Sequence, residues 1–155
     1  MIVYEESKEI SDPALHLLFT SNEMNDWFSE SDTQHYIESS LFVASAWDGL
    51  KCVGVAVLCG DGTISVELDV LLVDSSYRNR GIATKLMHSV MKRANELEPY
   101  HFKIEVFEGA AEKFYSQFGF RKNEGTWLLE HGPTGERTHQ TATRIRKELG
   151  KVTSS

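Results

Sequence analysis

Cysteine, proline and basic charge are all scarce in this sequence of 155 residues. The only two cysteines, Cys52 and Cys59, are seven positions apart, which fits neither a disulfide framework nor a CxxC redox or zinc pair. The six histidines, at positions 16, 35, 88, 101, 131 and 139, also lack the spacing of metal ligands. The sequence therefore predicts buried thiols in a cytoplasmic protein and no metal site.

Acidic residues outnumber basic ones by 23 to 16, which gives a formal net charge of −7. A broad basic face for nucleic acid is not expected on such a chain, whereas a cationic substrate would be attracted to it. No apolar run approaches the ~20 residues of a membrane span. The opening MIVYEESKEI turns acidic after four residues, unlike a signal peptide. Neither nucleic acid nor a membrane is therefore expected as a partner.

The patterns in the first half of the chain predict two short helices and then three strands. Ser11, Asp12 and Pro13 are typical of a helix start and predict a helix over 13–19, and a second helix is expected at about 32–39. Met24, Trp27 and Phe28 in the loop between them either line a ligand cleft or pack on the core. Two Asp-Gly signals divide the apolar, β-branched runs of residues 41–73 and predict a three-strand antiparallel meander.

The second half predicts a crossover connection between parallel strands. Apolar residues at helical spacing predict a helix over 84–98 that Pro99 ends. A strand over 102–107 and a helix over 110–118 follow, with Gly119 suited to end that helix. The strand that ends at Val73 and the strand at 102–107 should therefore run parallel. Strands at 127–130 and 138–147 are expected to form a hairpin, and a single domain over 1–150 with a frayed tail at 151–155 is predicted.

The segment DSSYRNRGIATKL, residues 74–86, leads directly from an apolar strand into a helix. It lies where α/β folds bind anions, at the carboxyl end of a parallel strand and the N-terminus of a helix. Gly81 allows close backbone approach, and Arg78 and Arg80 add positive charge. The segment has neither the Lys-Ser/Thr of a Walker A loop nor a GxGxxG pattern. A surface turn with solvated arginines would explain either arginine singly but not the whole arrangement.

Residues 78–83, RNRGIA, resemble the R/Q-x-x-G-x-G/A signature of the GNAT superfamily of acyl-coenzyme A dependent N-acyltransferases. The segment AEKFYSQFGF at 111–120 is similar to that family's A-x-x-F-Y-x-x-x-G-F segment. The resemblance implies a mixed α/β fold: a mostly antiparallel central sheet, splayed at a parallel pair, with helices on both faces. It also implies acetyl-coenzyme A as co-substrate. By resemblance, the residues that would bind it are Leu71, Leu72 and Val73, through a local bulge, and Arg78, Asn79, Arg80, Gly81, Ile82, Ala83 and Thr84, around the pyrophosphate.

Acyl transfer from a thioester to an amine needs placement of the two substrates, a base for the ammonium and an acid for the thiolate. Glu67 and Asp69 are two residues apart and so share one face of a strand. Because unpaired carboxylates are costly to bury, both should face the cleft. The resemblance places the base at Asp69 and a tyrosine near the coenzyme sulfur at Tyr115. The alternatives are a cross-strand salt bridge or an exposed strand face for the carboxylates, and core packing for Tyr115.

These residues and the resemblance predict an N-acetyltransferase for the primary amine of a small molecule. The amine would attack acetyl-coenzyme A directly in a ternary complex. Neither cysteine has a histidine near it in the sequence, so a cysteine acyl-enzyme is not expected. The alternative is a non-catalytic sensor or regulatory module of the same fold that binds coenzyme A. The identity of the acceptor, acylation of a protein, and a homodimer are left open.

Overall fold

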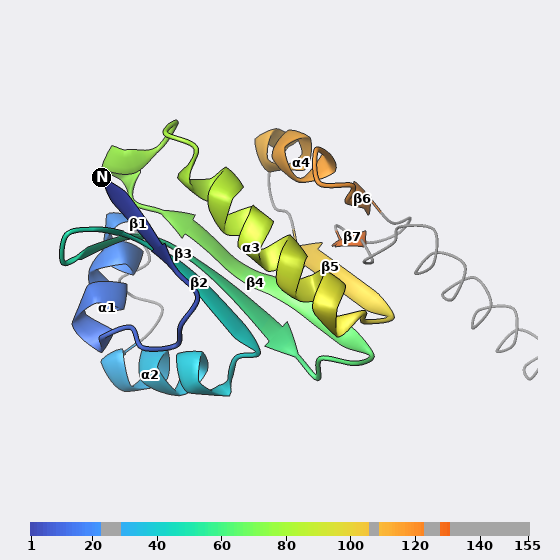
Figure 1. Ribbon diagram of the computed structural model, residues 1–155, viewed down its shortest axis with the longest axis horizontal. Coiled ribbons are helices and arrows are strands. Elements are labelled where there is room, and N and C mark those ends of the chain that lie inside the picture. Colours follow the sequence, from blue (N-terminus) through green and yellow to red (C-terminus); the bar gives the residue numbers. More distant parts are fainter. Residues whose placement is uncertain (23–28, 106–108, 123–127, 131–155) are drawn as a thin grey trace, which may run out of the picture. The chain divides into compact units, whose positions relative to one another are not determined.

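The computed structural model describes residues 1–22, 29–105, 109–122 and 128–130 (Figure 1). The chain divides into two compact units, residues 1–60 with 68–93, and residues 61–67 with 94–155. Met24, Trp27 and Phe28 lie outside the described residues, and so do the strand expected at 138–147 and the tail at 151–155. Among the residues described, no helix combines the length and the apolar character needed to cross a membrane.

The first unit contains the meander that the sequence predicts. Its elements are β1 (Ile2–Glu5), α1 (Asp12–Ser21), α2 (Glu30–Ser39), β2 (Phe42–Asp48), β3 (Lys51–Gly60), the end of β4 (Ser65–Val73), the short 3-10 helix η1 (Ser75–Tyr77) and most of α3 (Ile82–Leu97). The strands lie in the order β1, β2, β3, β4, and β2 runs antiparallel to both β1 and β3. The sequence pattern did not indicate β1, which is only four residues long.

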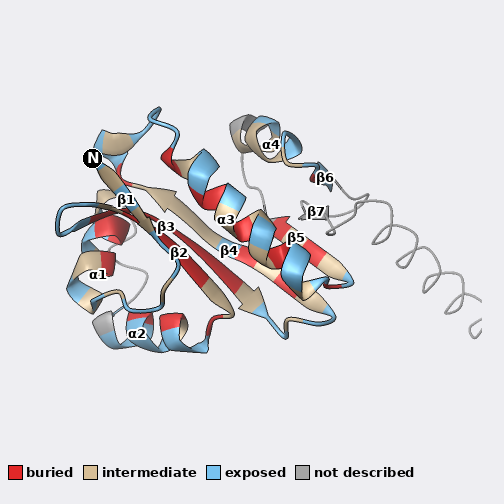
Figure 2. Ribbon diagram, viewed as in Figure 1, coloured by how far each residue is buried: buried red, intermediate tan, exposed pale blue. Residues whose placement is uncertain are grey.

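Helices cover both faces of this sheet (Figure 1). On one face, Leu15, Leu18 and Phe19 of α1 and Ile37 of α2 form a buried cluster with Val55 and Val57 of β3 and their neighbours. On the other face, Gly54 of β3 lies against Ile82 and Leu86 of α3. The strand alternates between its faces, so residues 54 and 55 point to opposite sides. Buried residues follow β3 and the inner side of α3 in Figure 2.

The two N-terminal helices begin at side-chain caps. Ser11 is the N-cap of α1, where its hydroxyl accepts a hydrogen bond from the N–H of Ala14. Ser29 and Asp32 form a capping box at the start of α2, with each side chain bonded to the other's backbone N–H. The second helix therefore begins at Glu30, two residues before the start that its apolar pattern indicates.

The second unit contains the parallel strand of the predicted crossover. Its elements are the start of β4, the end of α3, β5 (His101–Glu105), α4 (Gly109–Ser116), β6 (Arg121–Lys122) and β7 (Leu128–Glu130). The N–H groups of Tyr100 and His101 bond to the carbonyls of Thr63 and Ile64, which aligns the starts of β5 and β4. Strand β7 pairs antiparallel with β5 and β6. Gly119 follows α4 with a φ of +89°, as expected of a glycine past a helix end.

The fold is of the mixed α/β class that the sequence predicts, with a mostly antiparallel sheet and one parallel pair. The expected splay between the carboxyl ends of the parallel pair stays a prediction. The short strand β6 was not indicated by the sequence, because two residues carry no measurable periodicity.

Candidate functional site

Asp74 fixes the start of the loop between β4 and α3. Its backbone N–H donates to the carbonyl of Val53 at 2.9 Å, and its carboxylate accepts from the N–H of Ser76 at 2.9 Å. The Nζ of Lys51 lies 2.9 Å from the same carboxylate. Asp74 is buried, so these bonds anchor the loop to β3. The sequence offers one signal for this role, an Asp before Ser-Ser, which is typical of a side chain that caps a turn.

The electrostatics of Asp74 follow from these contacts. Burial alone would raise the pKa of this carboxyl, but hydrogen bonds from Lys51 and from the Ser76 N–H outweigh burial and lower it. Asp74 therefore stays ionised at neutral pH and holds the ammonium of Lys51 beside the loop.

Two residues of the motif have left-handed backbone conformations. The φ angles are +62° at Asn79 and +78° at Gly81, the residue before α3 begins. Arg78, the residue before Asn79, is extended, with φ −65° and ψ 157°, and Gly81 is the residue at which the chain enters the helix. The first N–H groups of α3, those of Ile82, Ala83 and Thr84, have no acceptor within the helix. A Cβ atom on Gly81 would have no neighbour within 4 Å, so the backbone is open to a ligand here.

Arg80 lies against the side chain of Tyr77 in the same loop. Its guanidinium carbon is 4.7 Å from the centre of the Tyr77 ring, and its Nη2 donates to the carbonyl of Ser76 at 3.3 Å. The hydroxyl of Tyr77 donates to Asp48 at 2.6 Å, and the Nζ of Lys51 lies 5.1 Å from the ring centre. Tyr77 therefore ties the loop to the β2–β3 turn and orients two cations on its faces.

Arg78 is held by the C-terminus of α1. Its Nη2 donates to the Oδ1 of Asn22 at 2.9 Å, while the Nδ2 of Asn22 donates to the carbonyl of Val73 at 3.3 Å and to that of Leu18 at 3.1 Å. The side chain of Asn22 thus joins α1, the end of β4 and the arginine. A guanidinium carries five donors, so this bond leaves Arg78 able to contact an anion.

The end of β4 packs against helices of the first unit. Asp69 contacts Tyr36 of α2, and Tyr36, Val70 and Leu72 all pack against the cluster that α1 and α2 form. The local bulge that the resemblance implies at this end of β4 stays a prediction. The pairing of residues 71–73 with pantetheine amides stays a prediction.

The two candidate carboxylates of β4 differ in their surroundings. Asp69 is exposed, and its Oδ2 accepts a hydrogen bond from the hydroxyl of Tyr36 at 2.5 Å. Glu67 is half-buried and belongs to the second unit. The Asp69 carboxylate thus bonds to a tyrosine of a helix, and its exposure agrees with the alternative of an exposed strand face.

Tyr115 lies on α4 in the second unit, within an aromatic group. Its ring makes edge contacts with Phe114, 5.1 Å away, and with Phe120, 6.1 Å away, and Phe120 in turn packs on the buried Phe102. Burial raises the pKa of Tyr115 to about 12, so the hydroxyl keeps its proton at neutral pH. A tyrosine in this state can donate a proton, and its role in catalysis stays a prediction.

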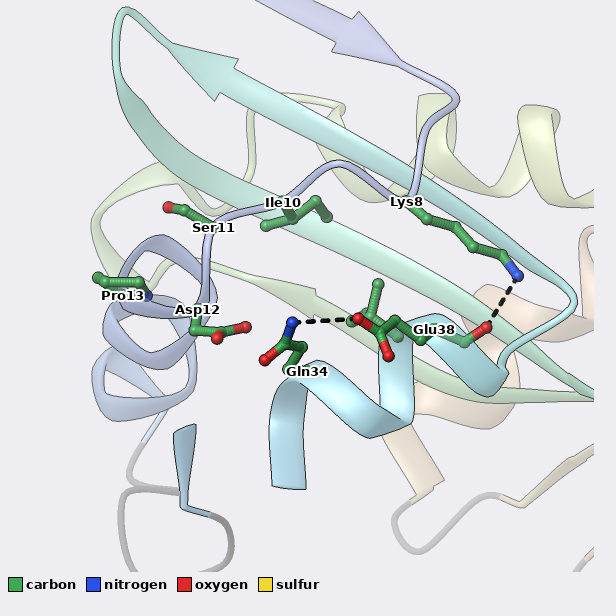
Figure 3. A pocket seen from close by; sticks show the side chains of 8 residues that line it. Lys8, Ile10, Ser11, Asp12, Pro13, Gln34 and Glu38 are labelled. Atoms are coloured by element: carbon green, nitrogen blue, oxygen red, sulfur yellow. Dashed lines mark hydrogen bonds between the residues drawn. The ribbon is translucent and has the colours of Figure 1, made fainter. Parts of the chain in front are cut away.

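A separate pocket of about 410 Å³ lies between the segment before α1 and helix α2 (Figure 3). Its polar lining includes Lys8, Asp12, Gln34 and Glu38. Lys8 donates to the carbonyl of Glu38 at 3.3 Å, and Gln34 donates to the carboxylate of Glu38 at 3.1 Å. None of the candidate catalytic or coenzyme-binding residues lines it. Across the described ranges, no group of three or more histidine, cysteine, aspartate or glutamate side chains is placed to hold a metal ion.

A comparison with models of protein families agrees with the motif of the loop and with the elements around it. Residues 7–132 match the model of the acetyltransferase (GNAT) domain, which covers more than half of the chain. The chain belongs to the GNAT acetyltransferase family. This confirms the family that the motifs at 78–83 and 111–120 indicate. A comparison with curated proteins gave no match.

Solved GNAT structures share the fold of this chain. A GNAT-family acetyltransferase from Streptococcus pneumoniae is 27% identical with a TM-score of 0.68, and the match covers 78% of this chain and 88% of that one. The ribosomal-protein-S18-alanine N-acetyltransferase from Escherichia coli is 17% identical, with a TM-score of 0.66 and 79% of each chain covered. An aminoglycoside 6'-acetyltransferase of type Ii is 18% identical, with a TM-score of 0.67 and 85% and 97% covered. The last two likenesses show the fold alone.

Within this GNAT chain, the first unit brings together most of the residues that the sequence singles out. Asp69, residues 71–73 and residues 78–84 all belong to it, whereas Glu67 and Tyr115 belong to the second unit. Ile82 is buried in the core, so only its backbone can serve a ligand. Sequence reasoning missed the residues that hold the loop in place: Asn22, Lys51 and Asp74. Asn22 and Lys51 carry no motif of their own, because their roles depend on contacts between distant segments.

Proposed function

We propose that this GNAT protein is an N-acetyltransferase that transfers the acetyl group of acetyl-coenzyme A to a primary amine. The observation that carries the proposal is the pair of left-handed residues, Asn79 and Gly81, at the start of α3. The unpaired N–H groups at the N-terminus of that helix and the open backbone at Gly81 would form a backbone cradle for an anion. Pyrophosphate is such an anion, and the family to which the chain belongs supports coenzyme A as its source.

The residues of the first unit would hold the coenzyme. The N–H groups of residues 80–84 bind the pyrophosphate oxygens, and Arg78, oriented by Asn22, adds a charge-assisted bond. The residues from Leu71 to Val73 pair with the amides of the pantetheine arm. The bound coenzyme would supply the acetyl group as a thioester.

The catalytic groups would be Asp69 and Tyr115, with Glu67 as the alternative base. Asp69 takes a proton from the ammonium of the acceptor, directly or through a water, and so frees the lone pair of the amine. The amine nitrogen then bonds to the acetyl carbon and loses its second proton to water, and the carbon–sulfur bond breaks. The departing thiolate takes the proton of the Tyr115 hydroxyl, and the tyrosinate recovers a proton from solvent. Burial raises the pKa of Tyr115 to about 12, which makes it a weaker acid than an ordinary tyrosine.

A small cationic amine is the proposed acceptor. The formal net charge of −7 favours such a substrate, and the exposed Asp69 supplies local negative charge. One structural neighbour is named for an aminoglycoside and another for an alanine of ribosomal protein S18. If charge recruits the acceptor, kcat/KM for the best amine should fall as salt rises. A kcat/KM that does not fall with salt would contradict electrostatic recruitment.

The test is an acceptor screen that detects release of the coenzyme A thiol from acetyl-coenzyme A. One arm contains small amines of different charge and the other contains short peptides with free N-termini. Thiol release that depends on a small amine supports the proposal, and release with peptides alone would shift the acceptor class to proteins. A chain that binds acetyl-coenzyme A in calorimetry but acetylates nothing in either arm would instead be a sensor or regulatory module.

A further inference from the structure

Tyr36 and Asp69 are 33 positions apart in the sequence, and the fold brings their side chains together. Tyr36 lies near the middle of α2 and Asp69 lies in β4. The hydroxyl of Tyr36 donates to the Oδ2 of Asp69 at 2.5 Å. This bond links a helix on one face of the sheet to the carboxylate proposed as the base.

The surroundings of Tyr36 make it a fixed donor. Its side chain packs against the buried cluster that includes Leu18, Phe19 and Ile37, so the ring has little freedom to leave Asp69. Burial, the bond to Asp69 and the neighbouring thiol of Cys59 all raise the pKa of Tyr36. The hydroxyl therefore keeps its proton throughout the pH range in which an acetyltransferase works.

The bond restricts the orientation of Asp69. An exposed aspartate can rotate about two side-chain torsions, and its carboxylate can accept hydrogen bonds at either oxygen. When Tyr36 holds the Oδ2, the direction of the Oδ1 is set as well. A base that is already oriented loses less entropy when it meets its proton donor, and small displacements of a reacting group slow catalysis.

We infer that Tyr36 is a positioning residue that orients Asp69 to receive the proton of the acceptor ammonium. The inference rests on the proposed function, in which Asp69 is the base. Tyr36 itself exchanges no proton with the substrate. The role requires only that its hydroxyl remain bonded to the carboxylate while the acceptor binds.

A double-mutant cycle tests this role with four proteins: wild type, Tyr36→Phe, Asp69→Asn and the double variant. We expect Tyr36→Phe to lower kcat about tenfold, within the range that misplacement of a reacting group produces, and to leave the affinity for acetyl-coenzyme A unchanged. In the Asp69→Asn background, the same change should have no further effect on kcat. Tyr4→Phe is the matched control, because it removes the hydroxyl of a half-buried tyrosine in β1 of the same unit.

The pH profile supplies a second readout that does not need the Asp69→Asn background. At a pH where the acceptor is already a free amine, base catalysis is dispensable. The deficit of Tyr36→Phe should therefore shrink as pH rises toward that range. A merely structural role would leave the deficit the same at every pH.

Each outcome decides between the hypotheses. A deficit of equal size in both backgrounds, or one that does not change with pH, would overturn the positioning role while the acetyltransferase activity stands. Wild-type kcat in Tyr36→Phe would overturn it too. If the wild type acetylates no amine or peptide at all, the proposed function fails and the role of Tyr36 fails with it.

Discussion

A Cβ atom on Gly54 would lie 2.9 Å from the Cγ2 of Ile82 and 3.1 Å from the Cδ1 of Leu86. The first turn of α3 thus packs directly on the backbone of β3, at the point where the loop between β4 and α3 ends. Gly54→Ala should force the start of α3 away from the strand. We expect a loss of about 1–3 kcal/mol in the free energy of unfolding, as for overpacking elsewhere, and weaker binding of coenzyme A in calorimetry.

The double variant Gly54→Ala with Ile82→Ala is the control for this prediction. Removal of the Cγ2 of Ile82 leaves room for the new methyl group. The double variant should therefore lose less stability than the sum of the two single changes. Additive losses would mean that Gly54 is not needed for the approach of α3.

Gly81 should be required for binding of the coenzyme. Its φ of +78° is unfavourable for any residue with a Cβ and most unfavourable for a β-branched one. Gly81→Val should therefore rotate the N–H groups of the cradle and weaken coenzyme A binding severely, whereas Gly81→Ala should weaken it less. Gly49→Ala is a matched control, since Gly49 also has a positive φ and no neighbour within 4 Å. Unchanged affinity in a folded Gly81→Val protein would refute the cradle.

Tyr115→Phe separates catalysis from packing by the loss of one oxygen. If the hydroxyl protonates the thiolate, kcat should fall by about 10²-fold, near the low end for general acid catalysis, while coenzyme binding is retained. If the ring only packs against Phe114 and Phe120, the change should cost about 1 kcal/mol of stability at most and leave kcat alone. Steady-state rates of wild type and Tyr115→Phe distinguish the two roles. Tyr100→Phe, a change at an exposed tyrosine of the same unit, is the control.

The Lys51–Asp74 pair should stabilise the fold in a pH-dependent way. The pKa of Asp74 is lowered because hydrogen bonds from Lys51 and Ser76 outweigh its burial. A lowered pKa contributes stability that is present above the ordinary aspartate value of about 4 and is lost as pH falls through the folded-state value. Lys51→Met should thus lower the unfolding free energy at pH ~7, and the difference from wild type should shrink in acid.

Urea denaturation of both proteins at neutral and acidic pH measures that difference. Lys92→Met, at an exposed position on α3, serves as the control. A deficit in Lys51→Met of the same size at both pH values would contradict the role of the ion pair.

Much of the fold and the family could be predicted from the sequence, because those signals are local. The two Asp-Gly turns gave the meander, and the helical spacing of apolar residues before Pro99 gave α3. The motif at residues 78–83 identified the loop, since backbone conformation at a helix start depends on few residues, above all on Gly81. Among the elements that the structure describes, local signals failed where they were too short, as in β1 and β6, or where a cap preceded the apolar pattern, as in α2.

The tertiary structure alone decided which side chains support the loop and the candidate base. Asn22 meets Arg78, Lys51 meets Asp74, and Tyr36 meets Asp69, in each case across more than 20 positions of sequence. None of these pairs follows a period or a motif, because each forms only when separate elements pack against one another. Periodicity fixes which face of a helix or strand a residue occupies, whereas its partner depends on the register and packing of other elements. The sequence by itself determined the family and the position of the loop. Only packing determined which residues hold the loop and the candidate base in place.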